Sequence, residues 1–260
     1  MFWSLAFLLV LLAIRRRWSW LVDVVRRPRV LAAFAASAVL LSINWVTYIW
    51  AVGNDHVVDA SLGYFMTPLV NVALGYTVLH ERLRRIQWAA LTLATLGVLW
   101  LTFQAGQLPW IALILASSFG VYGLLRKIAT LGALEGLTLE TMVLLPAAIA
   151  GFWYLQASGS ARFPTSDTAT NLWLLGVGPL TAVPLLLFAA GARRLSLTTL
   201  GLFQYLSPTL QFLIGIWVFH EPFSALRMIG FGLIWTALVL YSIDGWRHSR
   251  TAPQALVPSA

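Results

Sequence analysis

Long apolar runs separated by short polar or charged connections dominate the sequence. Most runs are close to the roughly 20 residues that a helix needs to cross the core of a bilayer, and the first is clipped to about two-thirds of that length. Glycine, proline, asparagine and clustered charges mark the ends of the runs, as they do at turns. The pattern predicts an all-α polytopic membrane protein with nine spans, at 1–14, 30–52, 58–80, 86–104, 109–125, 137–156, 172–192, 196–219 and 224–243.

The composition supports a membrane protein and excludes several other classes. Hydrophobic residues make up 60% of the chain, charged residues 10%, and the mean hydropathy is +0.82, which lies outside the range of ordinary soluble domains. The net charge of +8 does not indicate nucleic-acid binding, because the basic residues form short clusters between apolar runs. The chain has no cysteine, so disulfides, thiol nucleophiles and cysteine metal sites are excluded.

The basic residues predict the orientation in the membrane. Fifteen of the 17 fall in connections on one side, against Arg162 and Arg227 on the other. Positive residues stay in the cytoplasm, so this count places Met1 outside and the polar tail 245–260 inside, where we expect it to be disordered. A cleaved signal peptide is disfavoured because the first arginine cluster follows the apolar run and does not precede it.

One stretch of the chain occurs twice. Residues 61–81 and 201–221 are related by a constant shift of 140 without a gap. Basic residues follow the first copy, whereas Pro222 and two uncharged residues follow the second, so the copies have opposite orientations. The recurrence predicts inverted repeats, 1–104 and 105–244. The identical pairs are Leu62 and Leu202, Pro68 and Pro208, Gly75 and Gly215, Val78 and Val218, His80 and His220, and Glu81 and Glu221.

The repeat also predicts that a helix is missing from the first half. Shifting the second half back by 140 places the span 137–156 over the clipped opening run. The span 109–125 then falls before Met1. Four spans in the first half therefore face five in the second, and we expect two five-helix repeats of which the first lacks its opening helix.

Each copy carries a polar stripe on one helix face. Tyr64, Pro68 and Asn71 share a face, and so do Gln204, Pro208 and Gln211 in the second copy. Each proline frees the backbone carbonyl four residues earlier, so polar groups collect at one level of the membrane and must be buried in protein or line a wet cavity. Helix packing alone is the alternative, and tyrosines can also anchor a helix at the interface. The expected substrate pathway comprises Asn44, Tyr48, Tyr64, Pro68, Asn71, Tyr122, Gln204, Pro208 and Gln211.

Two acids are candidates for coupling transport to an ion. Glu140 lies one turn into the span that begins near Leu137, and Asp59 lies at the outer start of its span. Either is a proton or cation coupling group, or an interfacial acid that complements the helix dipole. The four histidines lie at span ends without ligand spacing, so we expect no metal site and no cofactor.

Several short runs match one known group of proteins. They are Asn44-Trp45, Ile49-Trp50-Ala51-Val52, Ala60-Ser61-Leu62-Gly63-Tyr64-Phe65, Pro68-Leu69-Val70-Asn71, Leu195-Ser196-Leu197-Thr198-Thr199-Leu200-Gly201-Leu202-Phe203-Gln204-Tyr205 and Ser207-Pro208-Thr209. These runs resemble the RarD branch of the EamA family, in the drug/metabolite transporter superfamily. The resemblance implies ten helices in two inverted repeats, a central cavity, and export of small metabolites or drugs across the bacterial inner membrane. The absent first helix departs from that pattern.

The sequence therefore favours a secondary transporter that works by alternating access, with a small-molecule substrate and the lipid bilayer as its partners. No phosphate-binding loop is present, so the energy would come from an ion gradient or from the substrate's own gradient. An intramembrane lipid-group transferase is one alternative, but it needs clustered catalytic groups, and the nine acids are scattered singly. A non-transporting membrane scaffold is the other alternative.

Overall fold

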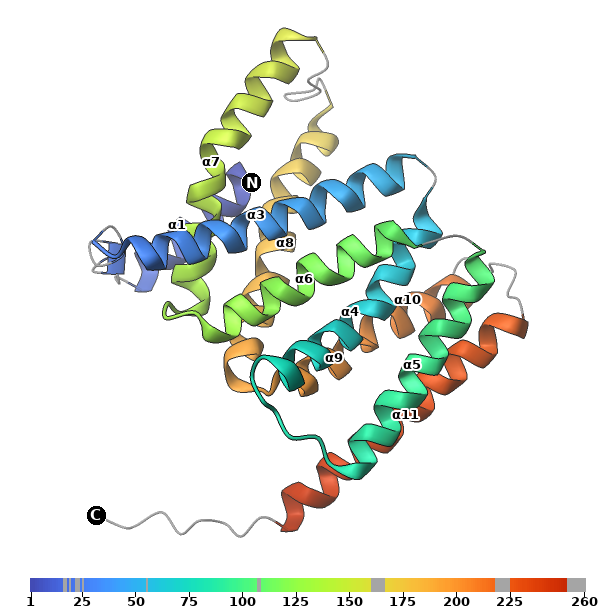
Figure 1. Ribbon diagram of the computed structural model, residues 1–260. Coiled ribbons are helices and arrows are strands. Elements are labelled where there is room, and N and C mark those ends of the chain that lie inside the picture. Colours follow the sequence, from blue (N-terminus) through green and yellow to red (C-terminus); the bar gives the residue numbers. More distant parts are fainter. Residues whose placement is uncertain are drawn as a thin grey trace, which may run out of the picture. The chain divides into compact units, whose positions relative to one another are not determined.

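The regular structure of the described residues is entirely helical (Figure 1). The computed structural model describes residues 1–15, 18, 20–21, 24, 26–54, 56–106, 109–159, 167–217 and 225–251. Its helices are α1 (Phe2–Arg15), α3 (Pro28–Gly53), α4 (Val57–Thr77), α5 (Arg85–Ala105), α6 (Trp110–Ile128), α7 (Ala133–Ala157), α8 (Thr168–Arg194), α9 (Leu197–Gln204), α10 (Leu206–Trp217) and α11 (Ala225–Thr251).

Six of these helices are long and apolar enough to cross a membrane, counted over the described residues. They are α3, α5, α6, α7, α8 and α11, whereas α1 is apolar but only 14 residues long. Large apolar side chains point outward on them, for example Phe103 with 83% and Trp153 with 73% exposure. Soluble proteins rarely expose continuous apolar surface of this kind. The chain is a multi-pass membrane protein, and the count of nine spans stays a prediction.

The segment expected as one span at 196–219 is interrupted. Helix α9 ends at Gln204, Tyr205 forms a turn, and α10 begins at the next residue. Pro208 has no N–H, so the carbonyl of Gln204 loses its usual partner four residues on. At the break itself, the Tyr205 N–H donates to the carbonyl of Leu202, three residues earlier, at 3.1 Å. By contrast, α4 contains Pro68 and continues without a break.

Three pairs of helices start at the spacing of the sequence repeat, whereas α1 and α7 do not. Helices α3 and α8 begin 140 residues apart, and the same spacing separates the starts of α4 and α9 and of α5 and α11. The duplication inferred from side chains is therefore matched by the positions at which the helices start.

The chain forms two compact units. Unit 1 comprises Met1–Val46 and Val121–Leu197, and unit 2 comprises Thr47–Gly120 and Thr198–Ala260. The boundaries fall within α3 and α6, so these two helices contribute to both units. Each unit contains segments from both expected repeats. The division of the chain by repeats is a statement about its sequence and stays a prediction.

In unit 1, α1 packs against α7 and α8. The hydroxyl of Ser4 donates to the carbonyl of Gly178 at 3.3 Å. A Cβ atom at Gly178 would lie 2.4 Å from the backbone carbon of Trp3, so the approach of α1 to α8 depends on this glycine. The buried apolar residues of unit 1 include Leu8, Leu12, Trp20, Val24, Phe34, Leu134, Leu137, Leu139 and Ala182.

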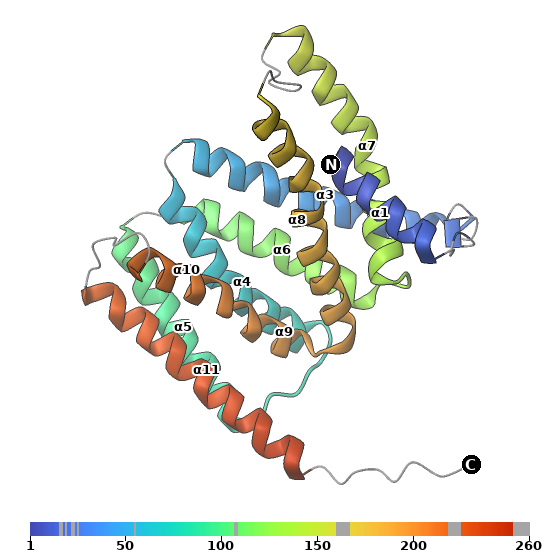
Figure 2. The same ribbon diagram turned by 180° about the vertical axis from the view of Figure 1, so that it is seen from behind.

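In unit 2, α5 and α11 lie side by side along much of their length (Figures 1 and 2). Small residues allow this contact: a Cβ atom at Gly97 would lie 2.8 Å from the carbonyl oxygen of Gly230. Close backbone approach at small residues is the usual way in which membrane helices associate. The buried apolar residues of unit 2 include Leu62, Phe65, Ala90, Ala94, Val98, Tyr205, Phe231, Ile234 and Ala237.

Different polar contacts join the two helices at the two ends of this pair. Trp100 and Gln104, near the end of α5, donate to the carbonyl of Leu226 near the start of α11, at 2.8 and 2.9 Å. At the opposite end, Arg84 forms an ion pair with Asp244 at 3.3 Å. The pair is therefore antiparallel, with neutral hydrogen bonds at one end and a charged contact at the other.

Candidate functional site

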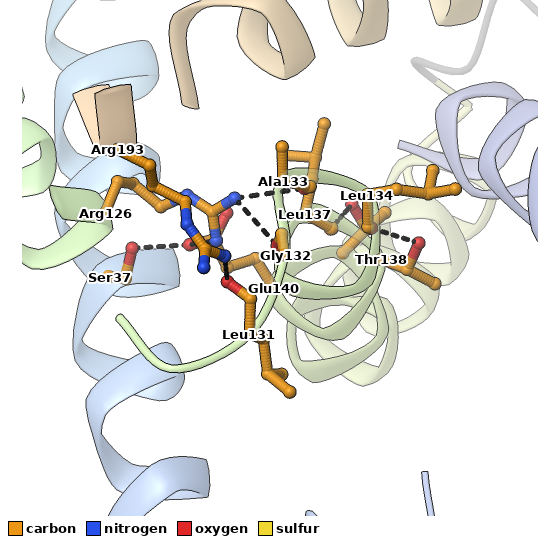
Figure 3. Close-up of polar contacts among 11 residues, drawn as sticks. Ser37, Arg126, Leu131, Gly132, Ala133, Leu134, Leu137, Thr138, Glu140 and Arg193 are labelled. Atoms are coloured by element: carbon orange, nitrogen blue, oxygen red, sulfur yellow. Dashed lines mark hydrogen bonds and ion pairs between the residues drawn. The ribbon is translucent and has the colours of Figure 1, made fainter. Parts of the chain in front are cut away.

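A buried charged cluster lies in unit 1, where α3, α6 and α7 meet (Figure 3). Arg126 and Glu140 are 0% and 1% exposed. The hydroxyl of Ser37 donates to Oε1 of Glu140 at 2.6 Å, and Nη1 of Arg126 lies 3.5 Å from the same oxygen. The Tyr122 hydroxyl lies beside the carboxylate. Opposite charges buried together offset part of the cost of removing each from water.

Arg126 is anchored mainly to backbone. Its Nη2 atom donates to the carbonyl of Ala133 at 3.0 Å and, at a longer 3.5 Å, to that of Gly132. Its guanidinium lies over the ring of Phe34, 5.5 Å from the ring centre. A Cβ atom at Gly136 would lie 2.0 Å from Nη1, so the guanidinium occupies space that only a glycine leaves open.

A second arginine reaches the same connection between α6 and α7. Arg193, at the end of α8, donates to the carbonyl of Leu131 (Figure 3). Its side chain is exposed, in contrast to that of Arg126. Two cations therefore bind the carbonyls of one turn, and one of them also faces a carboxylate.

The sequence predicted Glu140 as a candidate but missed Arg126. Because α7 begins at Ala133, Glu140 lies about two turns into the helix, deeper than the one turn expected from a start near Leu137. Arg126 counted only as one charge of a cytoplasmic connection. Opposite charges near the facing ends of two helices joined by a short turn were the signal that pointed to this pair.

A buried amide pair lies in unit 2. Nδ2 of Asn71, on α4, donates to Oε1 of Gln204, on α9, at 2.6 Å, and Asn71 is fully buried. Gly201 makes room for it, because a Cβ atom there would lie 2.9 Å from Cβ of Asn71. The structure thus joins two residues of the predicted stripes, one from each copy of the repeat.

Three oxygens of this region are left without their usual donors. Pro68 and Pro208, both buried, deprive the carbonyls of Tyr64 and Gln204 of the N–H four residues on. Oδ1 of Asn71 is buried and has no hydrogen-bond partner among the described residues. Such acceptors are costly in an apolar interior unless a ligand or water reaches them.

The tyrosines predicted for the pathway fall into two places. Tyr48 and Tyr64 stack edge-to-face in unit 2, with ring centres 5.9 Å apart. Tyr122 is fully buried in unit 1 and stacks on Phe188, so it does not lie at an exposed position. Asn44 is half-buried on the part of α3 that belongs to unit 1.

Two predicted residues lie outside the description of side chains. Gln211 falls in α10 and Asp59 in α4, but their side chains are not among those described.

The repeated glycine and glutamate of the first copy have a structural role in unit 2. Oε2 of Glu81 accepts hydrogen bonds from the N–H and the hydroxyl of Thr198, at 3.0 and 2.7 Å, in the first turn of α9. A carboxylate there satisfies backbone donors and complements the helix dipole. A Cβ atom at Gly75 would lie 2.7 Å from Oε2, so Gly75 leaves room for this cap.

The described residues contain no group of three or more His, Asp or Glu side chains able to hold a metal ion. The two polar clusters are built instead from an acid with an arginine and from two amides.

Comparisons with known proteins place the chain in a family. The model of the EamA-like transporter family matches residues 1–103. An uncharacterized transporter of Pseudomonas aeruginosa is 46% identical, over 97% of this chain and 85% of the relative. The protein RarD of Escherichia coli is 45% identical, over 93% and 82%. A second Pseudomonas aeruginosa protein, named chloramphenicol-sensitive protein RarD, is 30% identical, over 95% and 83%.

A solved crystal structure with 18% identity has a TM-score of 0.64 and is matched over 94% of this chain and 85% of that one, which establishes the shared fold alone. Identities above 40% over nearly the whole chain, with the same branch recurring among the relatives, show that the chain belongs to the RarD branch of the EamA-like transporter family.

Proposed function

We propose that the protein is a secondary transporter that exports small metabolites or drugs across the bacterial inner membrane, with its C-terminus in the cytoplasm. Its membership of a family of transporters and the names of its relatives support this function. The positions of the basic residues support the orientation.

The observation that carries the proposal is the amide pair Asn71–Gln204, joined at 2.6 Å inside an apolar helical unit. Polar groups within membrane segments are costly, so they are retained where they line a path for polar cargo or hold helices together. Here the pair coincides with two proline positions and an acceptor without a partner, which is more than helix packing requires. The substrate path is accordingly proposed along the two stripes, with Tyr48 and Tyr64 beside it.

We further propose that the protein works by alternating access of two inverted repeats. The segment with Pro68 is continuous, whereas its counterpart with Pro208 is broken at Tyr205. In inverted repeats the two halves adopt different conformations, and exchanging them turns the central site toward the other side of the membrane. In the opposite state, the break is expected near Phe65.

The energy is proposed to come from an ion gradient, with Glu140 as the coupling residue and Asp59 as a second candidate. Glu140 is buried and faces a single arginine, an arrangement typical of intramembrane acids that take part in transport.

Flux measurements in proteoliposomes test the proposed function. A panel of small metabolites and drugs, including chloramphenicol because of the printed name of one relative, would be loaded and its flux followed with and without an imposed ion gradient. We expect Asn71→Leu to abolish flux while expression is kept. Thr236→Val is the matched control, because that exposed hydroxyl donates within its own helix, to the carbonyl of Gly232 at 2.7 Å.

If flux is unchanged in Asn71→Leu, the amide pair has a packing role and does not line the substrate path. Absence of flux for the whole panel would favour a scaffold.

A further inference from the structure

We infer that Glu140 binds a proton and that Arg126 makes this site selective for a proton over a metal cation. The role of the site in transport rests on the proposed function, whereas proton binding itself can be measured without any substrate.

One oxygen of Glu140 is open to a proton. Oε1 accepts from Ser37 at 2.6 Å and faces Arg126, whereas Oε2 is buried and is bound by neither of them, with the Tyr122 hydroxyl beside the carboxylate. A proton taken from water can therefore bond to Oε2 without displacing Ser37 or Arg126, and it converts the carboxylate into a neutral acid. The serine hydroxyl can still donate to the carbonyl oxygen of the acid.

Arg126 does not depend on the carboxylate for its position. Its distance to Oε1 is 3.5 Å, longer than the roughly 2.7–2.9 Å of a strong charge-assisted hydrogen bond, whereas its bond to Ala133 is 3.0 Å. The guanidinium also has its ring contact with Phe34 and the space above Gly136. When Glu140 is neutralised, the arginine therefore stays beside it.

This fixed cation opposes a metal ion at the same carboxylate. A hard cation takes several oxygen ligands. At Glu140 that cation and its ligands would have to lie within a few ångström of the Arg126 guanidinium. Among the described residues, α3 contributes only Ser37 and α6 only Tyr122 besides the arginine. Arg193 of α8 adds a second cation at the turn between α6 and α7. Among the described residues, α1 contributes no charged contact to Glu140. A proton needs no such ligand set.

Proton binding changes the net charge of the cluster from zero to plus one, because Arg126 keeps its charge. In an apolar environment an uncompensated charge is costly, so the protein must respond by admitting a counter-charge or by rearranging. A transporter needs such a link between ion occupancy and conformation.

Infrared difference spectroscopy of the full chain in lipid tests proton binding directly. As the pH is lowered, the carbonyl stretching band of a protonated carboxylic acid should grow in the wild-type protein and be lost in Glu140→Gln. Asp244→Asn is the matched control, since Asp244 is a buried acid of unit 2 paired with Arg84, and this variant should keep the band. Absence of a band that depends on Glu140 would overturn the inference.

Selectivity is tested by adding sodium at a fixed pH. Sodium should leave the Glu140 band of the wild-type protein unchanged, and a loss of the band on adding sodium would refute the role of Arg126 without any variant. In Arg126→Gln, sodium should reduce the band. Arg193→Gln is the control, because this arginine binds the same turn but not the carboxylate. An Arg126→Gln band that ignores sodium would also count against the inference.

Flux measurements separate this inference from the proposed function. Wild-type flux should respond to a pH gradient and not to a sodium gradient, and Glu140→Gln should lose the pH response. Flux without any pH response would remove the coupling role of Glu140 while leaving a transporter. If Glu140 binds a proton but the protein moves no substrate, the proton site would be upheld and the proposed transport function refuted.

Discussion

Replacing Gly136 by alanine tests the geometry of the buried arginine. The added Cβ atom would lie 2.0 Å from Nη1 of Arg126 and 2.7 Å from Cε1 of Phe34, and real Cβ atoms essentially never lie within 3.0 Å of another heavy atom. Both distances are too short, so the Phe34 ring must shift and so must the guanidinium. Moving it lengthens its hydrogen bond to Ala133 and separates it from Glu140.

Three effects set the magnitude. Alanine is a better helix former than glycine by about 1 kcal/mol, which favours the variant. Overpacking costs about 1–3 kcal/mol if the guanidinium shifts only slightly. Separating a buried ion pair costs about 3–5 kcal/mol if the guanidinium leaves. Except for the mildest overpacking, the three effects together lower the free energy of unfolding, by up to about 4 kcal/mol when the ion pair separates. At about 2–4 °C per kcal/mol, the melting temperature should fall by several degrees or more.

The assay is thermal unfolding in detergent, compared with Gly151→Ala. Gly151 lies in the same helix, and its added Cβ atom would meet nothing within 4 Å, so this control receives the helix-propensity gain alone. We expect the control to melt at or slightly above the wild-type temperature and Gly136→Ala well below it. Equal melting temperatures for the two variants would refute the placement of the guanidinium against Gly136.

Three further predictions concern unit 2 and the start of α8. A double-mutant cycle of Asn71→Leu and Gln204→Leu, measured by unfolding in detergent, should give a coupling of about 0.6 kcal/mol, as is typical between membrane helices; a coupling of zero would mean that their 2.6 Å bond contributes nothing. Gly97→Ala should lower the melting temperature because its Cβ atom would meet a carbonyl at 2.8 Å, whereas Gly232→Ala, with open space, should not; the reverse order would contradict the close α5–α11 contact. The pKa of Asp167 is lowered by the hydrogen bonds it accepts at the start of α8, first from a hydroxyl and then from two backbone N–H groups. The folded pKa lies below the unfolded pKa of about 3.9, so the stabilisation is present above that pH and is lost as the pH falls through the folded pKa. The difference in melting temperature between the wild type and Asp167→Ala should therefore shrink on acidification. A difference that does not change with pH would exclude this cap.

The sequence predicted the helices closely because membrane helices depend on local pattern. An apolar run in a bilayer must satisfy its own backbone hydrogen bonds, and only a helix does so within one segment. The run expected at 86–104 is the helix Arg85–Ala105, and the run expected at 30–52 is Pro28–Gly53. The shift of 140, found from side chains, is also the spacing between the starts of three helix pairs, because duplicated segments carry the same pattern of turns.

The interruption at Tyr205 was beyond sequence reasoning. Pro68 and Pro208 are equivalent in the repeat, and each removes one hydrogen bond, yet only the second accompanies a break. A proline destabilises a straight helix, but the surrounding residues decide whether the helix stays continuous or breaks. At Gln204 these surroundings include the bond from Asn71, which comes from a segment 133 residues away.

The sequence by itself thus determined the class of protein, the positions of most helices, the internal repeat and the polar residues worth attention, since composition, local periodicity and self-similarity record each of these. Only the tertiary structure decided the partners: Asn71 with Gln204, and Glu140 with Arg126 and Ser37. Periodicity gives the face of a helix on which a side chain lies but not the helix that it meets. In these clusters the meeting depends on glycines such as Gly136, whose missing side chains leave room that no pattern of polar residues records.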